Sequence, residues 1–364
     1  MRVTLGDVCE KGSSNLKQSD VINKTGAYPI YGAAGYLGNV DFYHQDKPYV
    51  AVVKDGAGIG RTTLHPAKSS VIGTMQYLLP KSNVLPEYLY YVVQYMHLEK
   101  YFTGATIPHI YFKDYKAERF NLDAMERQKE IVASLQKVET LIKVRQQQLQ
   151  KLDELVKARF VEMFGDPVTN PMDWPTKPLL EMGYCKNGMN FHTGDSGIEM
   201  HCLGVGDFKD YSVIDGTDYL PTISLNEAPP EESMLQDGDL VFVRSNGNKA
   251  LVGRCLLVYP HNTPTTYSGF CIRYRLTSAE VNIAYLLRVL KTDSMRKKMA
   301  GRGANIQNLN QQILAALNIP TPPLELQEWF TAFIEQIDKS KVAVQKSLDE
   351  AQLLFDSLMQ QYFG

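Results

Sequence analysis

The sequence lacks the long apolar runs that membrane-spanning or exported proteins need. None of its 364 residues falls in an apolar stretch of about 18 residues, the length that crosses a bilayer. The start, MRVTLGDVCEKG, has no apolar core of the kind found in signal peptides. The five cysteines form no CxxC pair, which fits a reducing compartment better than a disulfide framework. We therefore expect a cytoplasmic protein without membrane contact.

Motifs for catalysis are also missing. The sequence has no P-loop, no Rossmann glycine fingerprint and no HExxH zinc motif. Its nearest approach to an amino-methyltransferase motif, Asn170-Pro171-Met172, lacks the second proline and the aromatic residue. The glycines of residues 56–60 can bring backbone N–H groups near a phosphate without hydrolysing anything. These absences predict a chain without catalytic residues, bound metal or bound cofactor.

The chain has little net charge, with 38 basic and 40 acidic side chains, which argues mildly against a free-standing nucleic-acid-binding protein. The average conceals an asymmetry. Residues 166–240 contain three basic and 14 acidic side chains, whereas residues 241–324 contain eleven basic and two acidic ones. Either this is an accident of solvated surface, or one domain directs a basic face toward an anion and an acidic face elsewhere. The asymmetry favours the second interpretation.

The most informative feature that is present is an internal repeat. Residues 104–165 align without a gap onto residues 303–364, at a constant offset of 199 residues and with 12 identities in 62 positions. Ordinary composition would give roughly four identities by chance. The repeat indicates duplication of one unit, a globular block followed by a helix, and a duplicated unit can recognise a bipartite target.

Each copy of the repeat contains a heptad pattern of apolar residues. In residues 123–164 the pattern is interrupted only by Arg145, and in the second copy only by Lys341. A pattern sustained over more than four heptads predicts two long helices that pair antiparallel as a coiled coil. The alternative is that each helix packs on its own domain as ordinary core. Arg145 and Lys341 either set the orientation of the pair or lie at its solvated edge.

The two globular blocks share an order of elements. Residues 48–53 and 239–243 read as strands, each followed by a turn-rich segment, a Gly-Arg pair and a helix-like stretch at residues 86–95 or 282–290. The sequence therefore predicts a mixed α/β (α+β) fold with an internal pseudo-twofold repeat. We expect domains at residues 1–124 and 166–322, and long helices at residues 125–165 and 323–364.

The polar side chains of both blocks suit the recognition of DNA. Guanidinium and carboxamide groups form bidentate contacts with guanine and adenine edges, and lysines contact phosphates. Helix caps and solvated loops would explain many of these residues equally well. The candidate DNA-binding residues are Tyr36, Lys54, Arg61, His109, Arg244, Asn246, Asn248, Lys249, Arg254, Arg302, Asn305 and Gln307.

The chain resembles the specificity subunits of type I restriction-modification systems over essentially its whole length. The resemblance is carried by residues 28–38 (YPIYGAAGYLG), the turn at 54–61, residues 319–327 (IPTPPLELQ), and the helix ends at 159–165 and 358–364. It implies two target-recognition domains joined by helices that pair antiparallel. Each domain would recognise one half of a split DNA site, and the helix length would fix the spacer.

The resemblance also implies partners and cofactors. The partners would be double-stranded DNA, two methyltransferase subunits, and restriction subunits that translocate DNA. S-adenosylmethionine would be bound by the methyltransferase partner, and ATP and Mg by the restriction partner, with no cofactor on this chain. Two alternatives remain: a self-contained restriction or modification enzyme with a cryptic active site, which would act on DNA unaided, and a coiled-coil adaptor for proteins, which would leave no sequence-dependent footprint.

Overall fold

The computed structural model describes residues 1–104, 108–191, 194–208, 212–300 and 308–364. They divide into two compact units. Unit 1 comprises Met1–Leu149 and Ala343–Gly364, and unit 2 comprises Gln150–Val342. Each unit combines one globular block with the start of one long helix and the end of the other.

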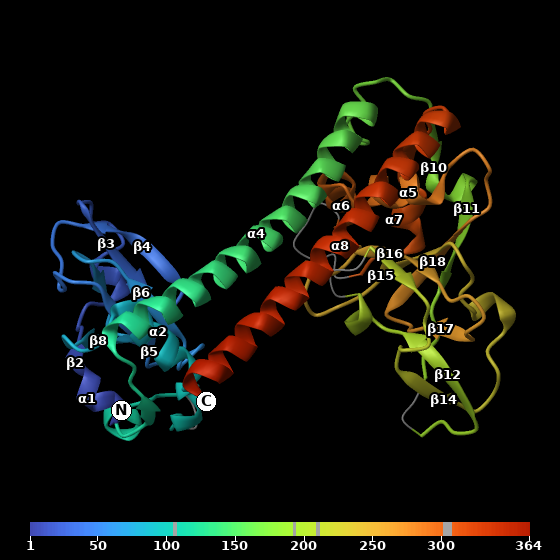
Figure 1. Ribbon diagram of the computed structural model, residues 1–364. Helices are drawn as coiled ribbons and strands as arrows, with labels where there is room; N and C mark the ends of the chain where they lie inside the picture. Colours follow the sequence, from blue (N-terminus) through green and yellow to red (C-terminus); the bar gives the residue numbers. More distant parts are fainter. Residues whose placement is uncertain (105–107, 192–193, 209–211, 301–307) are drawn as a thin grey trace. The chain divides into compact units, whose positions relative to one another are not determined.

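Two small sheets and one helix form the globular part of unit 1 (Figure 1). The larger sheet is antiparallel, in the order β2 (Cys9–Ser13), β8 (Met75–Pro80), β5 (Tyr49–Val53) and β6 (Thr62–His65). The smaller sheet has the order β4 (Gly35–Val40), β3 (Tyr28–Gly32) and β7 (Ser70–Val71). Every residue of β5 is buried, because Val50 and Val52 pack in the same core as helix α2 (Pro86–Tyr95), while Tyr49 and Ala51 pack beside Val71 in another.

Unit 2 repeats this plan with one more strand. Its larger sheet has the order β11 (Gly183–Asn187), β18 (Cys271–Leu276), β15 (Asp239–Val243), β16 (Cys255–Tyr259) and β13 (Val213–Asp215). Its smaller sheet has the order β14 (Thr222–Leu225), β12 (Ile198–Leu203) and β17 (Thr265–Tyr267), and helix α5 (Ile283–Lys291) packs on β16. Both predicted strands and both predicted helices are therefore confirmed to within one residue at each end.

Short elements connect each block to its helices. A two-stranded ribbon occurs in each unit, β1 (Arg2–Thr4) with β9 (Arg119–Asn121), and β10 (Thr176–Pro178) with β19 (Asn318–Pro320). The remaining helices are α1 (Leu5–Val8), α3 (Phe112–Tyr115), α6 (Asp293–Ala300) and α7 (Gln311–Ala315). Short 3-10 helices span Gln18–Asp20, Leu98–Tyr101, Leu179–Glu181, Val205–Asp207 and Glu231–Ser233.

The two long helices are α4 (Met125–Phe164) and α8 (Leu324–Phe363), each 40 residues. In unit 1 the start of α4, with Ile131 and Leu135 buried, shares a core with Phe355 and Met359 near the end of α8. In unit 2 the end of α4 meets the start of α8, where the Phe164 and Phe330 rings lie 5.4 Å apart. The start of each helix therefore packs against the end of the other, which confirms the antiparallel pairing.

The two cations that interrupt the heptad pattern make polar contacts to the facing helix. In unit 1 Arg145 Nε donates to Ser347 Oγ at 3.1 Å. In unit 2 Lys341 Nζ lies 2.5 Å from Asp153 Oδ1 and 3.6 Å from Asp338 Oδ1 on its own helix. Both charged side chains thus have a polar partner on the paired helix. In a shifted register of the helix pair they would face apolar residues of the heptad pattern instead.

A buried glutamine fixes each block to its long helix in the same way. In unit 1 Gln128 accepts a hydrogen bond from the Leu85 amide at 2.9 Å and donates to the carbonyls of residues 83 and 123. In unit 2 Gln327 accepts from the Asn282 amide at 2.8 Å and donates to the carbonyls of residues 280 and 322. Both glutamines are fully buried, and they lie 199 residues apart. The sequence repeat is therefore a repeat of specific contacts.

Candidate nucleic-acid interface

Both blocks present a loop at the end of a buried strand, and the same backbone hydrogen bonds close each loop. The last residue of β5 bonds to the Gly60 amide and the Arg61 carbonyl, both at 2.9 Å. The last residue of β15 bonds to the Gly253 amide at 2.9 Å and the Arg254 carbonyl at 2.8 Å. The Gly-Arg pair recognised in the sequence thus holds the same position in both blocks.

A second segment lies against each loop. The Ile110 amide donates to the Lys54 carbonyl at 2.9 Å, and the Leu309 amide donates to the Arg244 carbonyl at 2.7 Å. Ile110 and Leu309 are again 199 residues apart. Two candidate cations, Lys54 and Arg244, therefore occupy matching positions, directly after the last residue of β5 or β15. Each is hydrogen-bonded to the segment that contains Ile110 or Leu309.

In unit 1 the structure brings three polar side chains together at the start of the loop. His109 Nδ1 lies 2.7 Å from Asp55 Oδ1, and Lys54 Nζ lies 3.9 Å from Asp55 Oδ2. The His109 ring stacks on Tyr111 at 6.4 Å, and Lys113 lies above the Tyr111 ring at 5.4 Å. The carboxylate of Asp55 offsets part of the positive charge that Lys54 offers to a phosphate.

The other two candidates of unit 1, Arg61 and Tyr36, are associated with the hairpin formed by β3 and β4. The Arg61 guanidinium donates to the Ala33 carbonyl between these strands. A Cβ at Gly58 would lie 3.2 Å from that guanidinium, so the glycine leaves room for it. Tyr36 is 61% exposed, and its hydroxyl donates to Asn39 Oδ1 at 2.9 Å. Arg61 therefore contacts the hairpin that contains Tyr36, whereas Lys54 and His109 gather around Asp55.

In unit 2 the asparagines shape the loop that they belong to. Asn246 Oδ1 accepts the Asn248 amide at 2.8 Å, and Asn248 Oδ1 accepts the Ala250 amide at 3.0 Å. Such bonds from a side chain to a backbone amide two residues on are typical of Asx turns. Arg244 is half-buried, and its Nη1 donates to the Gly269 carbonyl at 3.2 Å. The loop is thus fixed by its own side chains and backs onto the turn before β18.

Two cations that we did not single out from the sequence lie near Arg254. Burial lowers the pKa of Lys291 and of Arg296, and the charge of Arg254 lowers both pKa values further. Lys291 Nζ donates to Ser212 Oγ at 2.6 Å, and Arg296 donates to the Ala250 carbonyl at 2.9 Å. Lys249, in the loop itself, is exposed. The sequence shows that Lys291 and Arg296 are basic residues of the helical stretch after the loop. It does not show that the two side chains approach the loop.

Three candidates, Arg302, Asn305 and Gln307, lie outside the described residues. The next residue, Asn308, is described and exposed, and it forms a β-bridge with Ser245 at the start of the loop. The amide-rich segment of the sequence therefore reaches the same loop at its described end.

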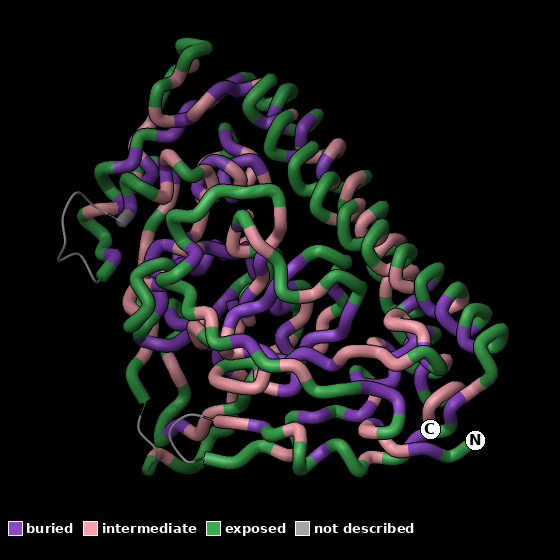
Figure 2. The backbone as a smooth tube through the Cα atoms, turned by 90° about the vertical axis from the view of Figure 1, so that its left-hand side faces the viewer, coloured by how far each residue is buried: buried purple, intermediate pink, exposed green. Residues whose placement is uncertain are grey.

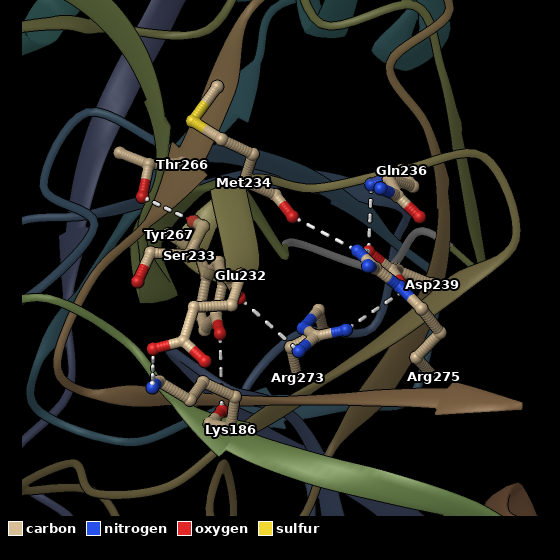
Figure 3. A network of polar contacts seen from close by, with 10 residues as sticks. All are labelled: Lys186, Glu232, Ser233, Met234, Gln236, Asp239, Thr266, Tyr267, Arg273 and Arg275. Carbon is tan, nitrogen blue, oxygen red and sulfur yellow. Dashed lines mark hydrogen bonds and ion pairs between the residues drawn. The ribbon is translucent and has the colours of Figure 1, made fainter. Parts of the chain in front are cut away.

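Part of the charge asymmetry is an internal network (Figure 3). The buried Asp239 accepts two hydrogen bonds from Arg275, at 2.7 Å each, and Arg273 Nη1 lies 3.7 Å from it. Arg273 is fully buried and donates to the Glu232 carbonyl at 3.3 Å, while Arg275 also donates to the Met234 carbonyl at 3.0 Å. Two cations of the basic stretch thus anchor the acidic stretch to β18 instead of facing an external anion.

Within the described parts of the chain, no three His, Cys, Asp or Glu side chains are grouped so that they could hold a metal ion. In the same residues no helix is both long and apolar enough to cross a membrane.

Comparison with known proteins gives one family. A model of the type I restriction modification DNA specificity domain matches residues 1–154 and 227–351. The StySPI specificity subunit of a type I restriction enzyme from Salmonella potsdam is 27% identical over 180 residues, which are 48% of this chain and 38% of that protein. The aligned part thus spans about two fifths of the length of that relative.

Two solved structures share the fold across the whole chain. The S subunit of a type I restriction-modification system from M. genitalium has a TM-score of 0.60 at 15% identity, covering 100% of this chain and 96% of that one. A second structure, concerned with complex assembly and conformational transition of the type I R-M system, has a TM-score of 0.58 at 16% identity and covers 100% and 97%. At these identities the likeness concerns the fold.

Proposed function

Because the chain belongs to the family of type I restriction modification DNA specificity domains, we propose that it is the sequence-specific DNA-recognition subunit of a type I restriction-modification complex. Each globular block recognises one half of a bipartite target. The chain itself is not catalytic.

The observation that carries this proposal is the duplicated loop frame with different side chains on it. The same backbone hydrogen bonds hold Lys54 and Arg61 in unit 1 and Arg244 and Arg254 in unit 2. Between them the first loop contains glycines and the second contains asparagines. A constant frame with different polar groups is what recognition of two different base sequences requires.

The proposed partners are double-stranded DNA, two methyltransferase subunits and restriction subunits. The methyltransferase partner would bind S-adenosylmethionine and the restriction partner ATP and Mg, all in the cytoplasm. Figure 2 shows exposed residues along the long helices, and several of these are large and apolar, which supports a protein-binding role for the helices. They are Leu141, Val144, Leu353 and Leu354 in unit 1, and Leu155, Val161, Trp329 and Val342 in unit 2.

The test removes four side chains of the second loop and measures methylation by the chain in complex with methyltransferase subunits. Combined alanine substitutions at Arg244, Asn246, Lys249 and Arg254 should abolish discrimination in one half-site and leave the other half-site intact. Each lost bidentate base contact should cost about 1–3 kcal/mol of discrimination. Methylation of a library of target sequences, read across a salt series, measures both half-sites together.

The control removes positive charge elsewhere in the same block. Lys177→Ala with Lys186→Ala breaks ion pairs with Glu280 and Glu232 and should leave the target sequence unchanged. A folded loop variant that methylates the full site at the wild-type rate at every salt concentration would refute the assignment of this loop. Methylation by the chain without partners would refute the non-catalytic role.

The long helices are proposed to set the distance between the half-sites. Seven residues inserted after Gln146 in α4 and after Lys346 in α8, beside the Arg145–Ser347 contact, add about 10 Å and keep the heptad phase. At 3.4 Å per base pair, the tolerated spacer should lengthen by about three base pairs. Methylation of targets with graded spacers measures this. An unchanged spacer in a folded complex would contradict the proposal.

A further inference from the structure

An exposed phenylalanine lies beside the second loop. Phe270 is 61% exposed at the turn that enters β18, where the Cys271 amide donates to the Ser268 carbonyl at 2.8 Å. The turn is held from the other side by the Gly269 amide, which donates to the Met189 carbonyl at 2.7 Å. The ring is therefore accessible to a ligand beside the polar residues of the second loop.

The backbone of Phe270 is held rigidly against the candidate loop. Its carbonyl accepts hydrogen bonds from the amides of Arg244, at 2.8 Å, and Ser245, at 3.2 Å. The strand that follows, β18, is fixed by the contacts of Arg273 and Arg275 shown in Figure 3. A fixed backbone presents the ring at a defined place relative to Asn246, which is what discrimination between bases requires.

Phe270 is one wall of a shallow depression. The depression has a volume of about 410 Å³ and is lined by Val205, Ser245, Asn246, Gly247, Phe270 and Asn308. Its walls therefore combine apolar groups with carboxamides. In the major groove adenine offers N7 and N6 to a carboxamide, and thymine alone offers a methyl group to an apolar side chain.

On the basis of the proposed function, we infer that Phe270 is a specificity-determining residue that packs against the C5-methyl group of a thymine, next to the base contacted by Asn246. The ring supplies the apolar contact, and Asn246 supplies hydrogen bonds to the neighbouring base. The half-site of this block therefore contains an A·T pair at the position that the Phe270 ring contacts.

Deoxyuridine tests this inference, because it differs from thymidine only by the missing methyl group. Each thymine of the half-site is replaced singly, and binding of the complex is measured by fluorescence anisotropy at fixed salt. One replacement should weaken wild-type binding about four-fold, the value of one buried methyl group. Phe270→Ala should bind thymidine and deoxyuridine at that position equally, and Phe270→Leu should retain part of the preference.

The matched control is Tyr219→Ala, which removes an aromatic side chain of the same exposure, 61%, from the same unit. It should keep the wild-type preference for thymidine. Sequence-specific binding without any effect of deoxyuridine, or a full preference retained by Phe270→Ala, would overturn the inference and leave the proposed function standing. Fluorescence of 2-aminopurine that rises only when Phe270 is present would also overturn it, because the ring would then be inserted between bases. Absence of specific binding by the wild-type complex would overturn both.

Discussion

The two globular blocks have the same hydrogen-bonded frame and different loops on it. In unit 1 the loop is short, and Gly56, Gly58 and Gly60 all have φ near +80°, a conformation that favours glycine. In unit 2 the loop is longer, and Asn246 and Asn248 hold its backbone through their own side chains. The two blocks thus share the contacts that build the frame and differ in the residues of the loop that the frame holds.

The same comparison holds for charge at matching positions. Asp55 follows Lys54 in the first loop and pairs with His109 at 2.7 Å. In the second loop the matching bridge joins Ser245 and Asn308, which carry no charge. The first loop is therefore partly neutralised within the protein, while the second leaves hydroxyl and carboxamide groups beside Arg244. The two blocks are suited to different base sequences.

The largest expected effect comes from breaking the frame itself. Gln128→Ala would leave the Leu85 amide and two carbonyls without partners, and Gln327→Ala would do the same in unit 2. Each buried group left unpaired costs about 1–3 kcal/mol, so each variant should lose about 3 kcal/mol or more of its unit's free energy of unfolding. Guanidinium unfolding followed by hydrogen exchange of each unit measures the two losses separately.

The matched control is Gln147→Ala, an exposed glutamine on the same helix as Gln128. It should change the free energy of unfolding by less than about 0.5 kcal/mol. If only one of the two buried glutamines proved costly, the repeat would be one of sequence and not of energetics.

Much of this frame could be predicted from the sequence, because repeats and heptads are local patterns. The 199-residue offset aligns Gln128 with Gln327, although their contacts appear only in the structure, and the Gly-Arg pairs located both loops. The heptad pattern gave the pairing of α4 with α8. The assignment of the individual DNA-binding residues stays a prediction.

The rest depends on contacts between distant residues, which local patterns do not contain. Arg273 and Arg275 read as part of a basic stretch, yet they are held by Asp239 and by carbonyls of the acidic stretch. Phe270 was not singled out from the sequence, and it lies exposed at a turn. The charge asymmetry therefore overstated the cations available to a ligand, and an exposed aromatic residue went unnoticed.

A smaller difference between the units should appear in acid. His65 on β6 is buried, and burial lowers its pKa to about 4. In unit 2 the exposed His261 instead has its pKa raised by a hydrogen bond to Asp215. Because the pKa of His65 is lower in the folded chain than in the unfolded chain, protonation of this side chain favours unfolding. The free energy of unfolding that the neutral side chain contributes is therefore present above pH 6.5 and is lost as the pH falls toward 4. Unit 1 should thus lose about 2–3 kcal/mol between pH 7 and pH 4.5 through His65.

His261 acts with the opposite sign, because a raised pKa stabilises the fold at low pH and the contribution fades as the pH rises through the folded pKa. Guanidinium unfolding of wild type and of His65→Gln at both pH values measures the first effect. The variant should lose less stability on acidification than the wild type. Equal losses would show that His65 does not titrate differently in the folded and unfolded chains.

The smallest expected effect separates the two glycines that close the loops. Gly60 and Gly253 hold matching positions with φ of +80° and +77°, so alanine should cost about 1–2 kcal/mol of backbone strain at either one. Their surroundings differ, because a Cβ at Gly60 would lie 2.5 Å from the Glu99 backbone amide, whereas one at Gly253 would lie 3.3 Å from Met299 Cβ. A contact at 3.3 Å is relieved by a shift of a few tenths of an ångström, whereas a contact at 2.5 Å with a backbone atom requires a larger movement of the chain. Gly60→Ala should therefore destabilise unit 1 more than Gly253→Ala destabilises unit 2, as measured by guanidinium unfolding with hydrogen exchange.

The control is Gly238→Ala, because Gly238 has a φ of +87° and open space around a Cβ. Its loss of stability measures the backbone strain without any steric contact. Equal losses at Gly60 and Gly238 would mean that the loop of unit 1 yields as easily as open surface, and the frame would then be less rigid than its hydrogen bonds indicate.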